Sequence, residues 1–62
     1  MNNYLFEVVS EYSEACGEQF FIQSDNYQEA EEILAQYFWG DRVRYLGRYS
    51  DEEAEAMGLD TY

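Results

Sequence analysis

The sequence contains no histidine, no lysine and no proline, and its only cysteine is Cys16. Without histidine and lysine, the usual general bases, Schiff-base nucleophiles and catalytic triads are absent. Carboxylate pairs remain, but most acidic residues fall on expected helix faces, loops and the tail, and 62 residues leave little room for a cleft. We therefore expect no enzymatic activity.

Cys16 has no partner for an internal disulfide, so a reducing compartment is its simplest setting. The neighbouring Glu14 and Glu18 disfavour the thiolate that a reactive cysteine needs. The acidic run at 51–55 lacks the residue spacing and central glycine of a calcium loop, and no glycine-rich phosphate loop is present. We expect no metal site and no cofactor. With no basic leader and no long apolar run, we expect a cytoplasmic protein without membrane association.

Basic residues are scarce: three arginines stand against fourteen acidic residues, which gives a formal net charge of −11. This charge argues against direct binding to nucleic acid or to an anionic membrane, and it favours a basic partner. Aromatic residues are abundant, with seven tyrosines, four phenylalanines and one tryptophan. Aromatics on strands can stack on RNA bases, but that function needs a positive groove, so we interpret them as core residues.

The clearest periodic pattern predicts an amphipathic helix over residues 26–39. Its apolar residues recur at intervals of three and four: Tyr27, Ala30, Ile33, Leu34, Tyr37 and Phe38. Asp25 and Gln28 fit a capping box at the start of the helix, and Gly40 is expected to end it.

Alternating residues predict three strands, at 3–12, 18–24 and 42–49, and a capping box from Ser50 to Glu53 predicts a short helix at 51–57. The order β-β-α-β-α indicates a single α+β domain whose three-stranded antiparallel sheet carries one helix on one face. The strand at 3–12 is the most apolar on both faces. We therefore place it at the centre, in strand order 2-1-3. The alternative is order 1-2-3, with the third strand parallel to the second.

The arginines suggest a register for the sheet, because all three fall on the predicted strand face that points away from the helix. Two opposite-charge pairs would then flank an apolar pair: Glu7 with Arg48, Glu11 with Arg44, and Val9 with Leu46. Closing the first hairpin at 13–17 would place Val8 opposite Ile22.

The sheet face away from the long helix carries four apolar residues that need a cover: Leu5, Val9, Phe21 and Leu46. One interpretation is that the C-terminal segment folds over them through Ala54, Met57, Leu59 and Tyr62. The other is that a partner protein, or a second copy of this chain, covers them. Trp39 lies off the helical stripe and is either a lid on the end of the core or an exposed anchor for a partner.

These features predict a small protein-binding module with an unidentified and basic protein partner. One alternative is a self-associating structural protein that dimerises through the open sheet face. Another is an inhibitor that mimics nucleic-acid charge and occupies a basic groove on a DNA- or RNA-handling protein. The last alternative is motivated by the acidic residues of both helices, including Glu29, Glu32, Glu52 and Glu55, which we expect to form one negative stripe.

Overall fold

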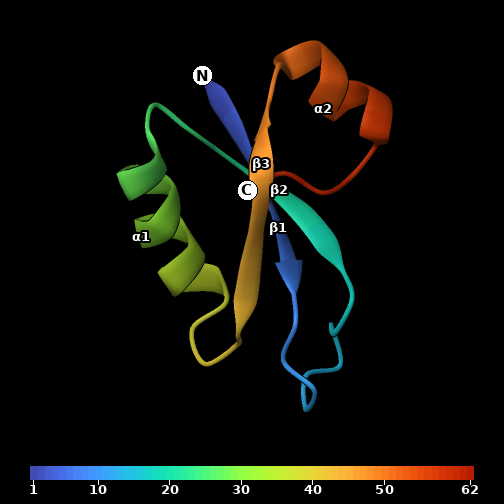
Figure 1. Ribbon diagram of the computed structural model, residues 1–62. Helices are drawn as coiled ribbons and strands as arrows, with labels where there is room; N and C mark the ends of the chain where they lie inside the picture. The colour runs from blue at the N-terminus through green and yellow to red at the C-terminus, as the bar shows by residue number, and fades with distance from the viewer.

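The computed structural model describes all 62 residues and confirms the predicted α+β fold. The elements are, in chain order, β1 (Asn2–Val8), β2 (Gln19–Ser24), α1 (Tyr27–Tyr37), β3 (Val43–Tyr49) and α2 (Asp51–Met57). The strands form one antiparallel sheet in the order β2-β1-β3, as predicted, so the alternative order is wrong. The two helices lie on opposite faces of this sheet (Figure 1). No helix has the length and apolar character needed to span a membrane.

β1 ends at Val8, four residues earlier than predicted. The hairpin closes there, because the N–H of Val8 donates to the carbonyl of Glu18 at 2.9 Å and the N–H of Gly17 donates to the carbonyl of Val8 at 2.8 Å. Residues 9–18 form a loop held by backbone turns, and Tyr12, which continues the alternating pattern, is 97% exposed. The polar loop is therefore longer than the alternation suggested.

Up to an irregularity in β3, the predicted register is wrong by four residues on both sides of β1. Ile22 lies opposite Tyr4 instead of Val8, and Arg44 lies opposite Glu7 instead of Glu11. Successive strand residues alternate between faces, so a shift by an even number leaves each side chain on its predicted face. The assignment of buried faces therefore survived an incorrect pairing.

A β-bulge in β3 changes the face assignment of its last residues. The register shifts between Leu5 and Phe6, and Gly47 beside the shift has a φ of +147°, which residues with a side chain rarely adopt. Beyond the bulge, Arg48 lies opposite Tyr4 on the α1 face and Tyr49 turns to the α2 face. The prediction that all three arginines share one face is thus wrong for Arg48.

α1 packs its apolar stripe against one face of the sheet, as predicted. The buried cluster beneath it consists of Tyr4, Phe6, Val8, Phe20, Ile22 and Ala30. Ile33 and Leu34 of the helix are partly buried against this cluster, and Phe38 stacks on Phe20 with ring centroids 4.1 Å apart. Ala30 is completely buried, and its small side chain lets the helix approach the strands closely.

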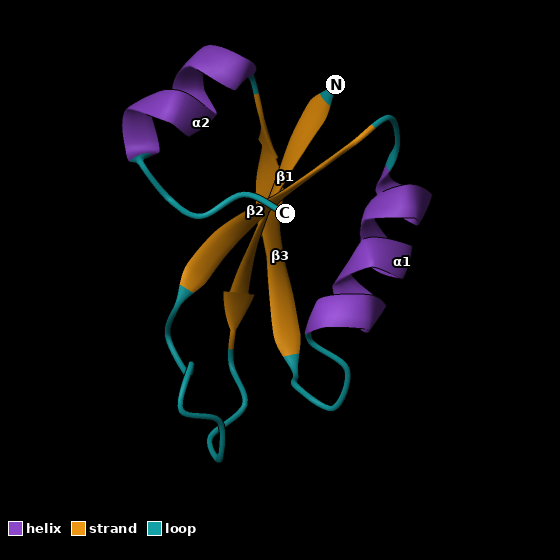
Figure 2. Ribbon diagram, turned by 180° about the vertical axis from the view of Figure 1, so that it is seen from behind, coloured by secondary structure: helices purple, strands orange, loops and turns teal.

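α2 and the tail cover the other face. Leu5, Phe21 and Ala54 form a second buried cluster, against which Leu46, Tyr49 and Leu59 pack. Residues 60–62 then run along the free edge of β2, where the N–H groups of Phe21 and Gln23 donate to the carbonyls of Asp60 and Tyr62 at 2.8 and 2.9 Å (Figure 2). The ring of Tyr62 reaches the α1 side, 5.4 Å from Phe38. The tail therefore protects an otherwise open strand edge.

The helix ends agree only in part with the predicted capping residues. α1 is capped by Asn26 rather than Asp25, since Asn26 Oδ1 accepts a hydrogen bond from the N–H of Glu29 at 2.8 Å. It ends at Tyr37 with Phe38 as its C-cap, so Gly40 belongs to the following loop. α2 has the predicted cap, because Ser50 Oγ accepts from the N–H of Glu53 at 3.2 Å.

Candidate functional site

The residues predicted to form an open sheet face are mostly covered by the chain itself. Leu5 and Phe21 are 3% and 0% exposed, and Leu46 is half-buried in the same cluster. Val9 lies beyond the end of β1 and is 37% exposed. The interpretation that the C-terminal segment covers this face is confirmed, although Met57 stays 41% exposed and Tyr62 crosses to the other side. A dimer or partner seated on Leu5 and Phe21 therefore has no accessible surface there.

The acidic residues chosen from the two helices are exposed but do not lie together. Glu29 and Glu32 are on α1, whereas Glu52 and Glu55 are on α2, on the opposite side of the sheet (Figures 1 and 2). The predicted single negative stripe is therefore wrong. Self-association and mimicry of nucleic-acid charge stay predictions.

The only ion pair in the protein joins Arg44 Nη2 to Glu7 Oε1 at 3.0 Å. The side chain of Arg44 is 65% exposed, so this pair contributes little to stability. None of the remaining carboxylates forms an ion pair with an arginine.

Trp39 follows the C-terminal end of α1 and is 83% exposed, so its interpretation as a lid on the core is wrong. Tyr37 beside it is 60% exposed, and its ring lies 5.0 Å from that of Tyr62. We call Tyr37, Trp39 and Tyr62 the aromatic end of α1. It brings the last turn of the helix together with the C-terminal residue of the chain.

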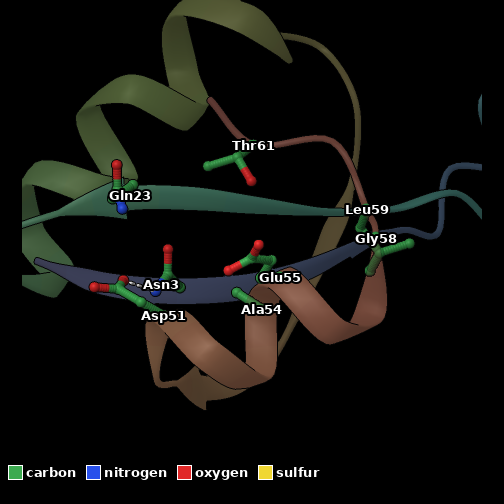
Figure 3. A pocket seen from close by; sticks show the side chains of 8 residues that line it. All are labelled: Asn3, Gln23, Asp51, Ala54, Glu55, Gly58, Leu59 and Thr61. Atoms are coloured by element: carbon green, nitrogen blue, oxygen red, sulfur yellow. Dashed lines mark hydrogen bonds between the residues drawn. The ribbon is translucent and has the colours of Figure 1, made fainter.

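A polar hollow of about 410 Å³ lies between α2 and the sheet. Its lining residues are Asn3, Gln23, Asp51, Ala54, Glu55, Gly58, Leu59 and Thr61 (Figure 3). Asn3 is only 2% exposed, and its Nδ2 donates to Asp51 Oδ1 at 2.7 Å and to the carbonyl of Tyr49 at 3.4 Å. These bonds tie α2 to β1, which gives Asn3 a structural role. No group of three or more cysteine or acidic side chains in the protein is arranged to hold a metal ion.

A second and more aromatic hollow, of about 680 Å³, is lined by Tyr4, Tyr27, Tyr45 and Arg48 on the α1 side. Burial of Tyr27, the nearby charge of Glu31 and the proximity of Tyr45 raise the pKa of the Tyr27 phenol above its ordinary value of 10.0. Sequence reasoning missed this hollow because simple alternation placed Arg48 on the other face. The signal that could have revealed it is Gly47, since a lone glycine within a strand often marks a bulge.

Comparison of the chain with protein-family models, with curated proteins and with solved structures gives no match. The function is therefore argued from the geometry and charge of these surfaces.

Proposed function

We propose that this protein is a small non-enzymatic module that binds a basic protein through α1 and its aromatic end. The observation that carries the proposal is the 83% exposure of Trp39, the only tryptophan, beside a helix whose outer face is acidic. Tryptophan is among the residues that contribute most to binding energy at protein interfaces. A single exposed indole in a chain of this size is therefore a reasonable anchor.

The charge of α1 supports a positively charged partner. Glu29, Glu31 and Glu32 are all exposed on the helix, and its last turn carries no basic residue. Acidic side chains on the helix that precedes an aromatic anchor speed the encounter with a basic surface and select against acidic proteins. The anchor then supplies buried area, while the carboxylates supply orientation.

The tail contributes to this surface as well. Tyr62 packs edge-on against Phe38, with ring centroids 5.4 Å apart, and lies beside Tyr37. The backbone of Tyr62 is held by two hydrogen bonds to β2, through its N–H to Phe21 and its carbonyl to Gln23. An aromatic surface that is held in place before binding loses less conformational freedom on association.

The test uses an amphipathic helical peptide of lysine and leucine as the probe, with Trp39 fluorescence and calorimetry as the readouts. Binding should shift the tryptophan emission to shorter wavelength. The double variant Glu29→Gln/Glu32→Gln should weaken binding by roughly five- to tenfold, in line with the usual strength of exposed charge pairs. Trp39→Ala should weaken it at least as much when measured by calorimetry.

The matched control is Glu52→Gln/Glu55→Gln on α2, which changes the net charge by the same amount on the opposite side of the sheet. It should leave the affinity within about twofold of the parent, because screened charges act over only roughly 10 Å. Equal losses in the two double variants would show that attraction is non-specific and would refute a site on α1. An unshifted emission spectrum would refute Trp39 as the anchor.

A further inference from the structure

The hollow lined by Tyr4, Tyr27, Tyr45 and Arg48, which we call the tyrosine hollow, lies beside the N-terminal end of α1 and has aromatic walls. The ring of Tyr27 lies 5.6 Å from that of Tyr4 and 4.9 Å from that of Tyr45, in edge-to-face arrangements. Tyr4 is 5% exposed and forms the floor, whereas Tyr27 and Tyr45 are 38% and 42% exposed and form the sides. Such walls are suited to a flat apolar group, since aromatic rings prefer edge-to-face or offset contacts.

The hydroxyl groups of this hollow have unused hydrogen-bond donors. The Tyr4 hydroxyl accepts a bond from Asn2 Nδ2 at 3.2 Å, and none of the three phenols donates to another protein group. The Tyr27 phenol is protonated at neutral pH, as its ordinary pKa of 10.0 already requires, and it keeps its donor. The hollow therefore offers unused hydroxyl donors beside the guanidinium donors of Arg48.

Arg48 provides the one positive charge at this site, and it has no carboxylate partner although acidic residues greatly outnumber arginines. Arg44 on the same strand does form an ion pair, with Glu7. Only the bulge next to Gly47 turns Arg48 toward the tyrosines, since regular alternation would keep Arg44 and Arg48 on one face. Bulges commonly re-aim a side chain beside a functional site.

We propose that this hollow binds an aromatic monocarboxylate, whose ring packs against the exposed sides of Tyr27 and Tyr45 and whose carboxylate pairs with the guanidinium of Arg48. A guanidinium binds a carboxylate through two parallel hydrogen bonds. One arginine in a chain of net charge −11 favours a single negative charge over a polyanion. The site is separate from the aromatic end of α1, so it does not depend on the function proposed above.

Binding of phenylacetate, followed by chemical shifts of backbone amides, tests this proposal. We expect a saturable change centred on residues 4, 27, 45 and 48, with a dissociation constant in the millimolar range or tighter. Acetate lacks the ring, and phenethylamine has the same ring but a positively charged ammonium group in place of the carboxylate. Each should bind at least tenfold more weakly than phenylacetate. Equal or tighter binding of either compound would overturn the proposal.

Variants separate the role of Arg48 from general electrostatics. Arg48→Gln should weaken phenylacetate binding by tenfold or more, and Arg48→Lys should restore only part of it because an ammonium lacks the planar pair of donors. Arg42→Gln is the matched control, since it removes the same charge from a residue outside the hollow and should change binding less than twofold. Similar losses in Arg48→Gln and Arg42→Gln would contradict a built site.

The carboxylate could belong to a free aromatic acid or to the last residue of a polypeptide, and one comparison distinguishes them. A short peptide ending in phenylalanine is tested with a free and with an amidated C-terminus. Weaker binding than phenylacetate supports a free acid as the ligand. Tighter binding that is lost on amidation supports the same chemistry and assigns it to a chain end. Equal binding of the amide would overturn the role given to the carboxylate.

Discussion

At the scale of single residues, Tyr27 has a protonation equilibrium that depends on the fold. The main cause of its raised pKa is burial, and the charge of Glu31 and the proximity of Tyr45 add to it. A pKa that is higher in the folded state gives a stabilising contribution that is complete below about pH 10 and is lost as the pH rises through the folded value. The side chain is 38% exposed, so screening by solvent keeps this contribution small.

The prediction is that Tyr27→Phe removes the most alkaline part of the phenolate absorbance titration. Glu31→Gln should move that part toward the ordinary value of 10.0, because one source of negative charge is gone. In urea unfolding, the parent should lose more stability than Tyr27→Phe between pH 9 and pH 11, a range that spans about one unit on either side of the ordinary tyrosine pKa. An alkaline titration unchanged by Tyr27→Phe would contradict this account.

Asn3 is a buried polar residue of β1 whose side chain ties α2 to the sheet. Its amide donates to Asp51 at 2.7 Å, at the first position of α2. We predict that Asn3→Asp destabilises the protein at neutral pH by about 2 kcal/mol or more, since a hydrogen bond is lost and two carboxylates meet at a buried site. The loss should shrink as the pH falls, because protonation of the introduced carboxyl removes the repulsion and restores a donor.

Two measurements check that explanation of Asn3. Urea unfolding at pH 7 and at pH 4 gives the pH dependence of the difference between variant and parent. Adding Asp51→Asn to Asn3→Asp should recover part of the stability at pH 7, because the repelling partner is removed. If the double variant is no more stable than Asn3→Asp, the contact between Asn3 and Asp51 is not the cause.

At the scale of elements, two adjacent residues at the start of α1, Asp25 and Asn26, contribute differently to its stability. Asn26 accepts a hydrogen bond from the N–H of Glu29, whereas no hydrogen bond is formed by the Asp25 side chain. Asn26→Ala should therefore lower the free energy of unfolding by about 1 kcal/mol, as the loss of an N-cap usually does. Asp25→Ala should lower the free energy of unfolding by only about 0.3 kcal/mol, through loss of its interaction with the helix dipole. Chemical unfolding of both variants measures the difference, and a larger effect at Asp25 would favour the capping box expected from the sequence.

The C-terminal tail pairs with β2 through one isolated parallel bridge, between Thr61 and Phe21. Tyr62→Ala should reduce stability by about 1–2 kcal/mol, since aromatic pairs contribute roughly 0.5–1.5 kcal/mol each and the ring contacts Phe20, Phe38 and Tyr37. Amide exchange at Phe21 and Gln23 should accelerate, because both N–H groups donate to the tail. Tyr12→Ala removes a ring that is 97% exposed and serves as the control, with no expected change. Unaltered exchange in Tyr62→Ala would show that the ring does not hold the tail.

The elements themselves were predictable because each has a local signal. The stripe that includes Ala30 and Ile33 indicates the helix, and Ser50 and Glu53 mark the start of α2. The order of the strands was predicted correctly, but their register was not predictable, since it depends on how many residues the loop after Val8 uses in its own turns. Alternation determines which face of the sheet each side chain occupies. It does not determine the register, because a shift by any even number of residues keeps every side chain on the same face.

The candidate site was predictable to a smaller extent. Exposure of Trp39 was one of two interpretations, and the structure selects it because the helix ends two residues before this position. The tyrosine hollow was not predicted, since it brings together residues from β1, α1 and β3 and needs the bulge beside Gly47. Sites built from several elements depend on register, which is the quantity that local patterns leave open.

At the scale of the whole molecule, acidic residues greatly outnumber basic ones. The net charge of −11 is confined to a molecule with a radius of gyration of 11.0 Å, and only one ion pair opposes the repulsion. Carboxylates on α1, on α2 and in the loop at 9–18 therefore repel one another across the entire surface. Repulsion of this kind destabilises the compact state more than the expanded one.

Added salt should consequently raise the melting temperature, because at roughly 0.1 M salt charges more than about 10 Å apart no longer repel strongly. The measurement is thermal unfolding followed by circular dichroism in sodium chloride between about 10 and 500 mM, a range over which the screening length falls several-fold. Glu52→Gln/Glu55→Gln should show a smaller increase, since it has less repulsion to screen, whereas Arg44→Gln should show a larger one because its only ion pair is lost. A melting temperature that falls with salt would mean that attraction such as that between Arg44 and Glu7 outweighs repulsion. Repulsion among the carboxylates would then not be the main electrostatic effect on stability.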